Sequence, residues 1–241
     1  MRSVERNGVK IHFEVVGEGP PVVLLHGSAG DRTMWRHAGY VDGLDGFSRV
    51  LVDSRSRGLS GRLAAERAHR LEEHVALWRY SSGAHGAAAV AQRLPEWVGA
   101  LITTSWTADM GTPEERDRLI QVLESSGMNG LNSELEREEG ISLPSWMREQ
   151  FLATDPGVFV AEVKGFGDGS QVRASLGTIR APALLLVGAL EDPEGEAART
   201  AALLPSGKAV TLPGVGHIGA FLASEQAQPH ALGLLHACLA G

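Results

Sequence analysis

The sequence lacks several features that would assign the protein to other classes. It contains a single cysteine, Cys238, so no internal disulfide can form and no thiolate cluster is available to bind a metal. The 22 lysines and arginines are outnumbered by 29 aspartates and glutamates, and a net charge of −7 argues against binding to nucleic-acid phosphates. No apolar run approaches the roughly 18 residues of a membrane helix, and residues 1–6 lack the apolar core of a signal peptide. We therefore expect a cytoplasmic protein without a nucleic-acid or membrane partner.

Short apolar segments alternate along the chain with segments that have helical patterns. Residues 9–15 alternate between apolar and polar side chains, which is typical of a strand at a sheet edge. Continuous apolar runs indicate strands buried on both faces, and helix-like segments lie between them. The expected buried strands are 22–25, 50–52, 75–80, 98–103, 183–187 and 209–212, and the expected helices are 63–74, 84–94, 194–204 and 225–239. This order predicts an α/β fold with a doubly wound, mostly parallel sheet.

One block, residues 108–176, interrupts this alternation because it is polar, helix-prone and free of buried-strand runs. Thr112 and Pro113 have the pattern of a helix N-cap followed by proline, and Pro144 and Pro156 suggest two further helix starts. We expect residues 1–107 and 177–241 to form the core, with 108–176 inserted as a helical lid. The alternative is an ordinary helical excursion packed beside the sheet.

Two strand ends carry residues suited to acyl chemistry. The run at 22–25 leads into His26-Gly27-Ser28, a turn whose backbone N–H groups could stabilise a developing negative charge. The run at 75–80 leads into Ser81, and small residues that begin a helix follow it directly. A serine at such a turn projects at the carboxyl end of the sheet beside a helix N-terminus. The alternative is that Ser81 or Ser82 only caps the helix.

Two later strand ends supply an acid and a histidine. Asp192 follows the strand at 183–187 and precedes a proline, so a capping role is its alternative, and Glu191 is the competing acid. His217 lies on a glycine-flanked loop after the last expected strand. It is the histidine that follows both the serine and the acid on such a loop.

Together these segments resemble the α/β-hydrolase fold superfamily, in the branch of esterases, lactonases and haloperoxidase-like enzymes. The resemblance covers nearly the whole chain, and the order Ser81, Asp192, His217 matches that family. It is carried by residues 26–28, 81–98, 181–193 and 214–217, and by 53–60, which is similar to the family's Asp-x-Arg-Gly-x-Gly-x-Ser segment.

The resemblance implies a role for each candidate residue. Ser81 would be the nucleophile, His217 the general base and then general acid, and Asp192 the residue that orients the imidazole. The oxyanion donors would be backbone N–H groups of Gly27 or Ser28 and of Ser82. His26 and Trp106 are predicted to line the substrate pocket. The resemblance implies no metal or organic cofactor, and a small-molecule ester, lactone or thioester as substrate.

Two neighbouring features depart from the family pattern. Arg79 stands where the family's Gly-x-Ser-x-Gly elbow has its first glycine, so a long side chain must fit where two backbones normally meet. The segment from Asp53 to Ser81 is also shorter than usual, as though half of a crossover helix were missing. A deletion here predicts a misplaced Ser81 and an impaired enzyme.

We therefore distinguish three hypotheses. The first is a serine hydrolase of small acyl substrates, which the serine, acid and histidine favour. The second is a non-catalytic protein of the same fold that binds a small ligand or a protein partner, which Arg79 favours. The third is a lyase or cofactor-free haloperoxidase-like activity at the same residues.

Overall fold

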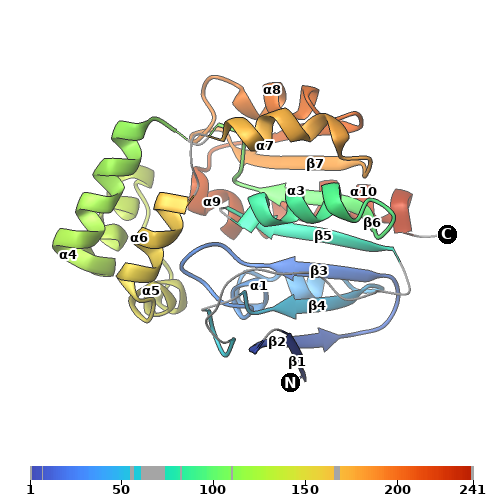
Figure 1. Cartoon of the computed structure of the whole chain (residues 1–241), viewed down its shortest axis with the longest axis horizontal. Coiled ribbons are helices and arrows are strands. Elements are labelled where there is room, and N and C mark those ends of the chain that lie inside the picture. Colours follow the sequence, from blue (N-terminus) through green and yellow to red (C-terminus); the bar gives the residue numbers. More distant parts are fainter. Residues whose placement is uncertain are drawn as a thin grey trace.

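The computed structural model of the protein describes residues 2–6, 8–54, 57–60, 74–81, 83–109, 111–165 and 169–239. These residues form one twisted sheet with helices on both faces and further helices beyond one end of its strands (Figure 1). The strands are β1 (Arg2–Arg6), β2 (Val9–Val16), β3 (Pro21–Leu25), β4 (Ser48–Val52), β5 (Val75–Tyr80), β6 (Val98–Thr104), β7 (Ala183–Gly188) and β8 (Gly207–Leu212). The helices are α1 (Met34–His37), α2 (Tyr40–Gly43), α3 (Gly83–Arg93), α4 (Pro113–Glu139), α5 (Ser145–Leu152), α6 (Pro156–Gly165), α7 (Ser170–Ser175), the 3-10 turn η1 (Leu176–Thr178), α8 (Glu196–Ala202), α9 (His217–Leu222) and α10 (Ser224–Leu239).

The strand order across the sheet is β1-β2-β4-β3-β5-β6-β7-β8 within the described part of the chain. β2 pairs antiparallel with β1 and β4, whereas all pairings among β3 to β8 are parallel. This confirms the predicted mostly parallel, doubly wound sheet. β1 was not predicted, because its sequence RSVER has one apolar residue and carries no strand pattern of its own. It is a strand because β2 offers it a pairing edge.

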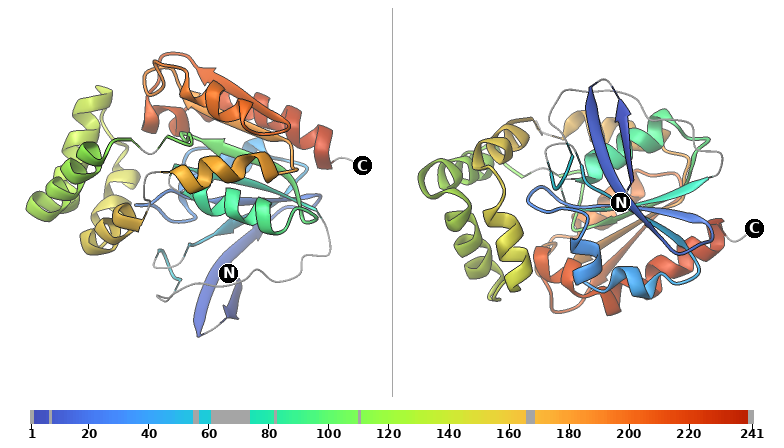
Figure 2. Two further views of the ribbon diagram at one scale, coloured as in Figure 1. Left: turned by 45° about the horizontal axis from the view of Figure 1, so that its top comes forward. Right: turned by 90° about the horizontal axis from the view of Figure 1, so that it is seen from below.

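Each face of the sheet buries its own hydrophobic core, and both faces are covered by helices (Figure 2). Side chains of a strand alternate between faces, so consecutive residues of β5 enter different cores. Ala76, Trp78 and Tyr80 pack with Trp35, Tyr40 and Phe221, while Val75 and Leu77 pack with Ala87, Ala91 and Leu185. The parallel strands are apolar on both faces for this reason.

The inserted block forms α4, α5 and α6, which lie together beyond one end of the strands (Figure 1). α4 begins as predicted: the Thr112 hydroxyl accepts a hydrogen bond from the Glu115 N–H, and the Glu115 carboxylate accepts one from the Thr112 N–H. The long helix is kinked at Gly127, where φ is 58° and ψ is −153°. α5 and α6 also begin at the two predicted prolines.

The chain returns to the core earlier than the predicted boundary at residue 176. α7 lies beside α3, and Leu176 is fully buried in the core on that face. α1 and α2 were not predicted, because helices of four residues have no sequence periodicity to read. The expected helix at 63–74 falls almost wholly outside the described residues.

Candidate active site

Ser81 occupies a strained turn between β5 and α3. Its φ is 54°, in the left-handed region that residues with a side chain seldom adopt. The backbone holds this conformation because the Ser81 N–H donates to the Thr104 carbonyl at 2.8 Å, which extends the pairing of β5 with β6 past the strand end. Strain of this kind persists only where the surrounding structure determines it, and it is concentrated at functional sites.

Ser81 begins a chain of hydrogen bonds across three segments. The Ser81 Oγ lies 2.9 Å from His217 Nε2, and His217 Nδ1 lies 2.8 Å from the Glu191 Oε2. His217 is the first residue of α9, and Glu191 lies in the loop after β7. The second Glu191 oxygen accepts the Gly188 N–H at 2.8 Å, so both carboxylate oxygens have a partner.

The contact with the His217 imidazole that was expected of Asp192 is therefore made by Glu191. Asp192 Oδ1 accepts the Glu196 N–H at 2.6 Å and its Oδ2 accepts the Ala197 N–H at 3.1 Å, so this carboxylate caps the N-terminal end of α8. The prediction of Asp192 as partner of the imidazole is wrong, and Glu191, the competing acid in the sequence, takes that place. The reason is the loop conformation: adjacent side chains leave the backbone in different directions, and the longer one faces His217.

Glu191 and His217 shift each other's proton affinity. Burial raises the pKa of Glu191, but the hydrogen bond and charge of His217 and the Gly188 N–H outweigh it, so this pKa is lowered. Burial lowers the pKa of His217, but the hydrogen bond and charge of Glu191 and the charge of Glu139 outweigh it, so this pKa is raised. The arrangement therefore stabilises an imidazolium beside a carboxylate.

Gly27 and Ser28 lie beside the serine and line the cavity in front of it. A Cβ on Gly27 would stand 2.9 Å from the Tyr80 ring and 3.3 Å from the Ser81 Cβ, so glycine is what lets this loop approach the serine. The third predicted donor, Ser82, lies outside the described residues.

His26 is not among the residues that line the cavity, contrary to expectation. Its side chain is buried, with Nε2 accepting the Ser54 N–H at 2.9 Å and Nδ1 2.7 Å from the Gly27 carbonyl. Because Nε2 accepts, the proton is on Nδ1 and is donated to that carbonyl. Burial lowers the pKa of His26 to about 4, so it stays neutral. His26 ties the loop of Gly27 to the loop after β4.

Trp106 does not line the cavity either. It is 6% exposed and packs with Ala108 and Leu176 in the core on the α3 face. It follows β6 and Ser105, which like Ser81 is a described residue with a side chain and a positive φ, here 53°. The Ser105 Oγ donates to the His217 carbonyl at 2.7 Å.

Arg79 is accommodated beside a glycine of the following helix. A Cβ on Gly86 would lie 2.2 Å from the Arg79 Nη1, so the guanidinium occupies space that any other residue at 86 would take. Burial lowers the pKa of Arg79 to about 10, although the charge of Glu162 opposes this. Residues 76–80 of β5 also pair with β6 without a break in register, after a shift between Val75 and Ala76. Together with the Ser81–His217 hydrogen bond, this counts against a misplaced Ser81. Most of the short crossover itself, residues 61–73, lies outside the described residues.

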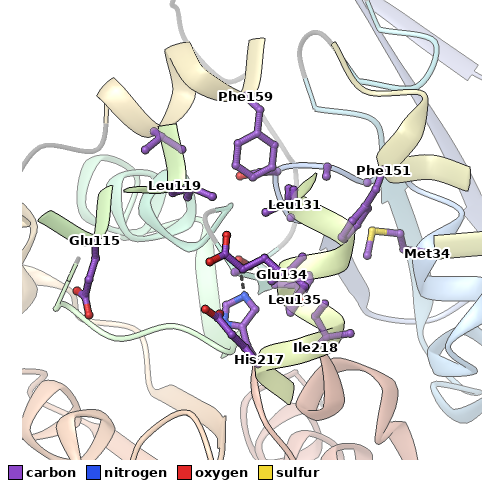
Figure 3. A pocket seen from close by; sticks show the side chains of 18 of the residues that line it. Met34, Glu115, Leu119, Leu131, Glu134, Leu135, Phe151, Phe159, His217 and Ile218 are labelled. Carbon is purple, nitrogen blue, oxygen red and sulfur yellow. Dashed lines mark hydrogen bonds between the residues drawn. The ribbon is translucent and has the colours of Figure 1, made fainter. Parts of the chain in front are cut away.

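Ser81 and His217 line a cavity of about 480 Å³ that lies between the sheet and the inserted helices (Figure 3). Most of its wall is apolar and comes from α4, α5 and α6, with Ile218 and Met34 on the opposite side. The apolar residues that line it include Met34, Leu119, Leu131, Leu135, Phe151, Phe159, Val163 and Ile218. Trp146 and Met147 of α5 are not among the lining residues.

One part of the cavity wall is acidic. Three glutamates of α4 line this part and form what we call the acidic rim: Glu115, Glu134 and Glu138. Arg118, also on α4, is the basic residue among the lining residues. Arg118 pairs with Glu134 and lies 3.9 Å from Glu138, so it compensates only part of the charge.

Neither a metal site nor a membrane span is found in the described ranges. No three histidine, cysteine, aspartate or glutamate side chains there are placed to hold a metal ion. None of the helices described is long and apolar enough to cross a membrane.

Comparison with known proteins establishes the fold. No family model matches the chain, and no curated protein matches it in sequence. Among solved structures, a thermophilic esterase from Thermogutta terrifontis is similar, with a TM-score of 0.80, 22% identity, and coverage of 99% of this chain and 100% of that one. The enol-lactonase from Burkholderia xenovorans LB400 is similar with a TM-score of 0.79 and 20% identity, and the match covers 97% of this chain and 99% of that one. An esterase from Exiguobacterium antarcticum is similar with a TM-score of 0.78 and 19% identity, and the match covers 94% of this chain and 96% of that one. The chain has the α/β-hydrolase fold.

Proposed function

We propose that the protein is a serine hydrolase that transfers the acyl group of a small ester, lactone or thioester to water. The observation that carries this proposal is the chain of hydrogen bonds from Ser81 through His217 to Glu191, which begins at a strained serine facing a cavity. A serine that only capped α3 would need neither a positive φ nor an imidazole on its oxygen. The esterases and the lactonase of the same fold are consistent with this proposal.

The geometry suggests how the reaction proceeds. The Ser81 Oγ attacks the acyl carbon while His217 Nε2 takes its proton, and Glu191 stabilises the imidazolium that forms. The carbonyl oxygen becomes negative and would be met by backbone N–H groups of the Gly27–Ser28 loop and of Ser82. His217 then gives its proton to the leaving oxygen or sulfur as the bond to the acyl carbon breaks. In the second half His217 takes a proton from a water molecule while the water oxygen attacks the acyl carbon. The bond between the acyl carbon and the Ser81 Oγ then breaks, the acid leaves, and His217 returns the proton to the Oγ.

The wall of the cavity suggests the kind of acyl group. An apolar volume of about 480 Å³ accommodates a small to medium apolar substrate, and such sites use few polar groups for orientation.

A fluorophosphonate probe with short-chain nitrophenyl esters tests the proposal. The wild type should be labelled at Ser81 and should hydrolyse the esters, while Ser81→Ala should do neither. If the wild type neither labels nor turns over above that variant, the protein is not a serine hydrolase and the ligand-binding alternative is favoured.

A further inference from the structure

The lid reaches the histidine segment through one carboxylate. Glu139, the last residue of α4, accepts the Ile218 N–H on Oε1 at 2.5 Å and the Gly219 N–H on Oε2 at 3.0 Å. These are N–H groups of the first turn of α9, the helix that begins at His217. Such groups have no partner within their own helix and require one from elsewhere. Figure 1 shows α9 at the side of the sheet that faces the inserted helices.

The packing around this carboxylate leaves little freedom. A Cβ on Gly216, the residue before His217, would lie 3.0 Å from the Glu139 carboxylate. Gly216 has no side chain with which to cap α9, so Glu139 supplies the cap from a segment far away in the sequence. Glu139 is half-buried and is not among the residues that line the cavity. Its contacts are thus with the backbone that carries the imidazole and not with the space for substrate.

Glu139 also contributes charge beside the imidazole. His217 is faced by Glu191 from the loop after β7, by Glu139 from α4, and by the Tyr80 ring of β5 at 5.5 Å between ring centroids. The Ser105 hydroxyl contacts the His217 backbone from β6. Glu191 and Glu139 are therefore the two acids whose charges favour the protonated imidazole.

We propose that Glu139 is a positioning residue for the reaction: its carboxylate fixes the first turn of α9, and so His217, to the lid, and adds a second negative charge beside the imidazole. This inference rests on the proposed function. Because the contact joins the lid to α9, any displacement of the end of α4 would move or release the histidine segment.

Glu139→Gln tests both parts of this role. Glutamine keeps one acceptor oxygen but loses the charge and turns an N–H₂ group toward the backbone N–H groups of α9. We expect kcat for a neutral ester to fall about tenfold, since small displacements of a catalytic group cost 10- to 100-fold, with KM little changed. The acid limb of the pH profile should move to lower pH, because His217 loses a favourable charge.

Two further variants separate this role from simple loss of stability. Glu139→Asp retains the charge on a shorter side chain, so its acid limb should stay nearer to that of the wild type while kcat is intermediate. Glu124→Gln is the matched control: Glu124 lies on the same helix, is 60% exposed, pairs with Lys164 at 3.6 Å and does not line the cavity. It should leave kcat and the pH profile unchanged. Thermal denaturation of each variant reports whether it is folded.

An NMR titration of the His217 imidazole gives a readout that does not require turnover. The titration midpoint should be lower in Glu139→Gln than in the wild type and in Glu124→Gln. If no ester is hydrolysed but this difference is present, the proposed function fails while the link between Glu139 and His217 stands. If kcat and the His217 midpoint of Glu139→Gln equal those of Glu124→Gln, or if only KM and the melting temperature change, the positioning role is refuted.

Discussion

The neighbouring acids Glu191 and Asp192 provide the sharpest prediction, because their side chains make contacts of different kinds. Glu191 contacts the imidazole of His217, whereas Asp192 caps α8. Replacing each acid by its amide removes one charge at nearly the same place in the chain. The two variants are therefore controls for each other.

Glu191→Gln should lower kcat/KM severely, and the reason lies in the hydrogen bond from the Gly188 N–H to the side chain at position 191. The buried Gly188 N–H needs an acceptor, so the amide oxygen takes the Oε1 position and the N–H₂ group turns toward His217 Nδ1. An imidazole that accepts at Nδ1 carries its proton on Nε2, and then it cannot accept the proton of Ser81. The variant thus holds the histidine in the wrong tautomer.

The size of the effect follows from two costs. Turning the amide to restore the working tautomer leaves the Gly188 N–H without a partner, which costs about 1–3 kcal/mol. Replacing a charged acceptor for the imidazolium by a neutral one costs about 1–2 kcal/mol more. Together these reduce kcat/KM by roughly 30- to 5000-fold.

Asp192→Asn should behave differently, because asparagine can still accept from the first turn of α8. We expect kcat/KM within about twofold of the wild type. Asp192→Ala removes the cap, which costs about 0.5–2 kcal/mol and lowers the melting temperature by a few degrees. Ester hydrolysis and thermal denaturation of the three variants check this. If Asp192→Asn loses activity while Glu191→Gln retains it, the reasoning from the hydrogen bonds is refuted.

Three further predictions concern pH, the Arg79 site and substrate charge. Because the pKa of His217 is raised above 6.5 and the base must be neutral, kcat/KM should rise through a midpoint above pH 6.5. The stability that the raised pKa of His217 contributes to the folded state should be complete below pH 6.5 and be lost as pH rises through that pKa. Urea denaturation at several pH values would show this. A midpoint of the kcat/KM profile at or below pH 6.5 would contradict the role of His217 as the base. Gly86→Ala should be less favourable for stability in the wild type than in an Arg79→Ala variant, by about 1 kcal/mol or more, because only in the wild type must the methyl group displace the guanidinium. A double-mutant cycle without coupling would show that the two residues do not share space. The acidic rim should lower kcat/KM for an acyl chain that ends in a carboxylate by about tenfold or more relative to a neutral chain of equal length, and added salt should narrow this gap; equal rates at low salt would rule out the effect.

Much of the fold is readable in the sequence because burial on both faces of a parallel sheet requires apolar residues in continuous runs. Residues 75–80 and 183–187 show this directly, and both are strands. β1 and the short helices α1 and α2 are not readable, because their residues lack a pattern and adopt structure only through pairing or packing with other segments.

The order of the site segments follows from the amino-acid sequence: a serine after one buried strand, acids after a later strand, and a histidine after the last. It also placed Ser81 and His217 at strand ends, where parallel strands bring their carboxyl ends to one edge of the sheet. These two residues form the hydrogen bond from which the proposed function follows.

Three features depend on how the chain folds in space. Glu191 and not Asp192 contacts His217, His26 and Trp106 lie away from the cavity wall, and Gly86 makes room for Arg79. It also brought Glu139 to the first turn of α9 from a helix that is remote in sequence. The physical reason is the same in each case. Which way a loop side chain points, and which distant backbone it meets, depends on φ and ψ angles and packing that residue type and spacing do not specify.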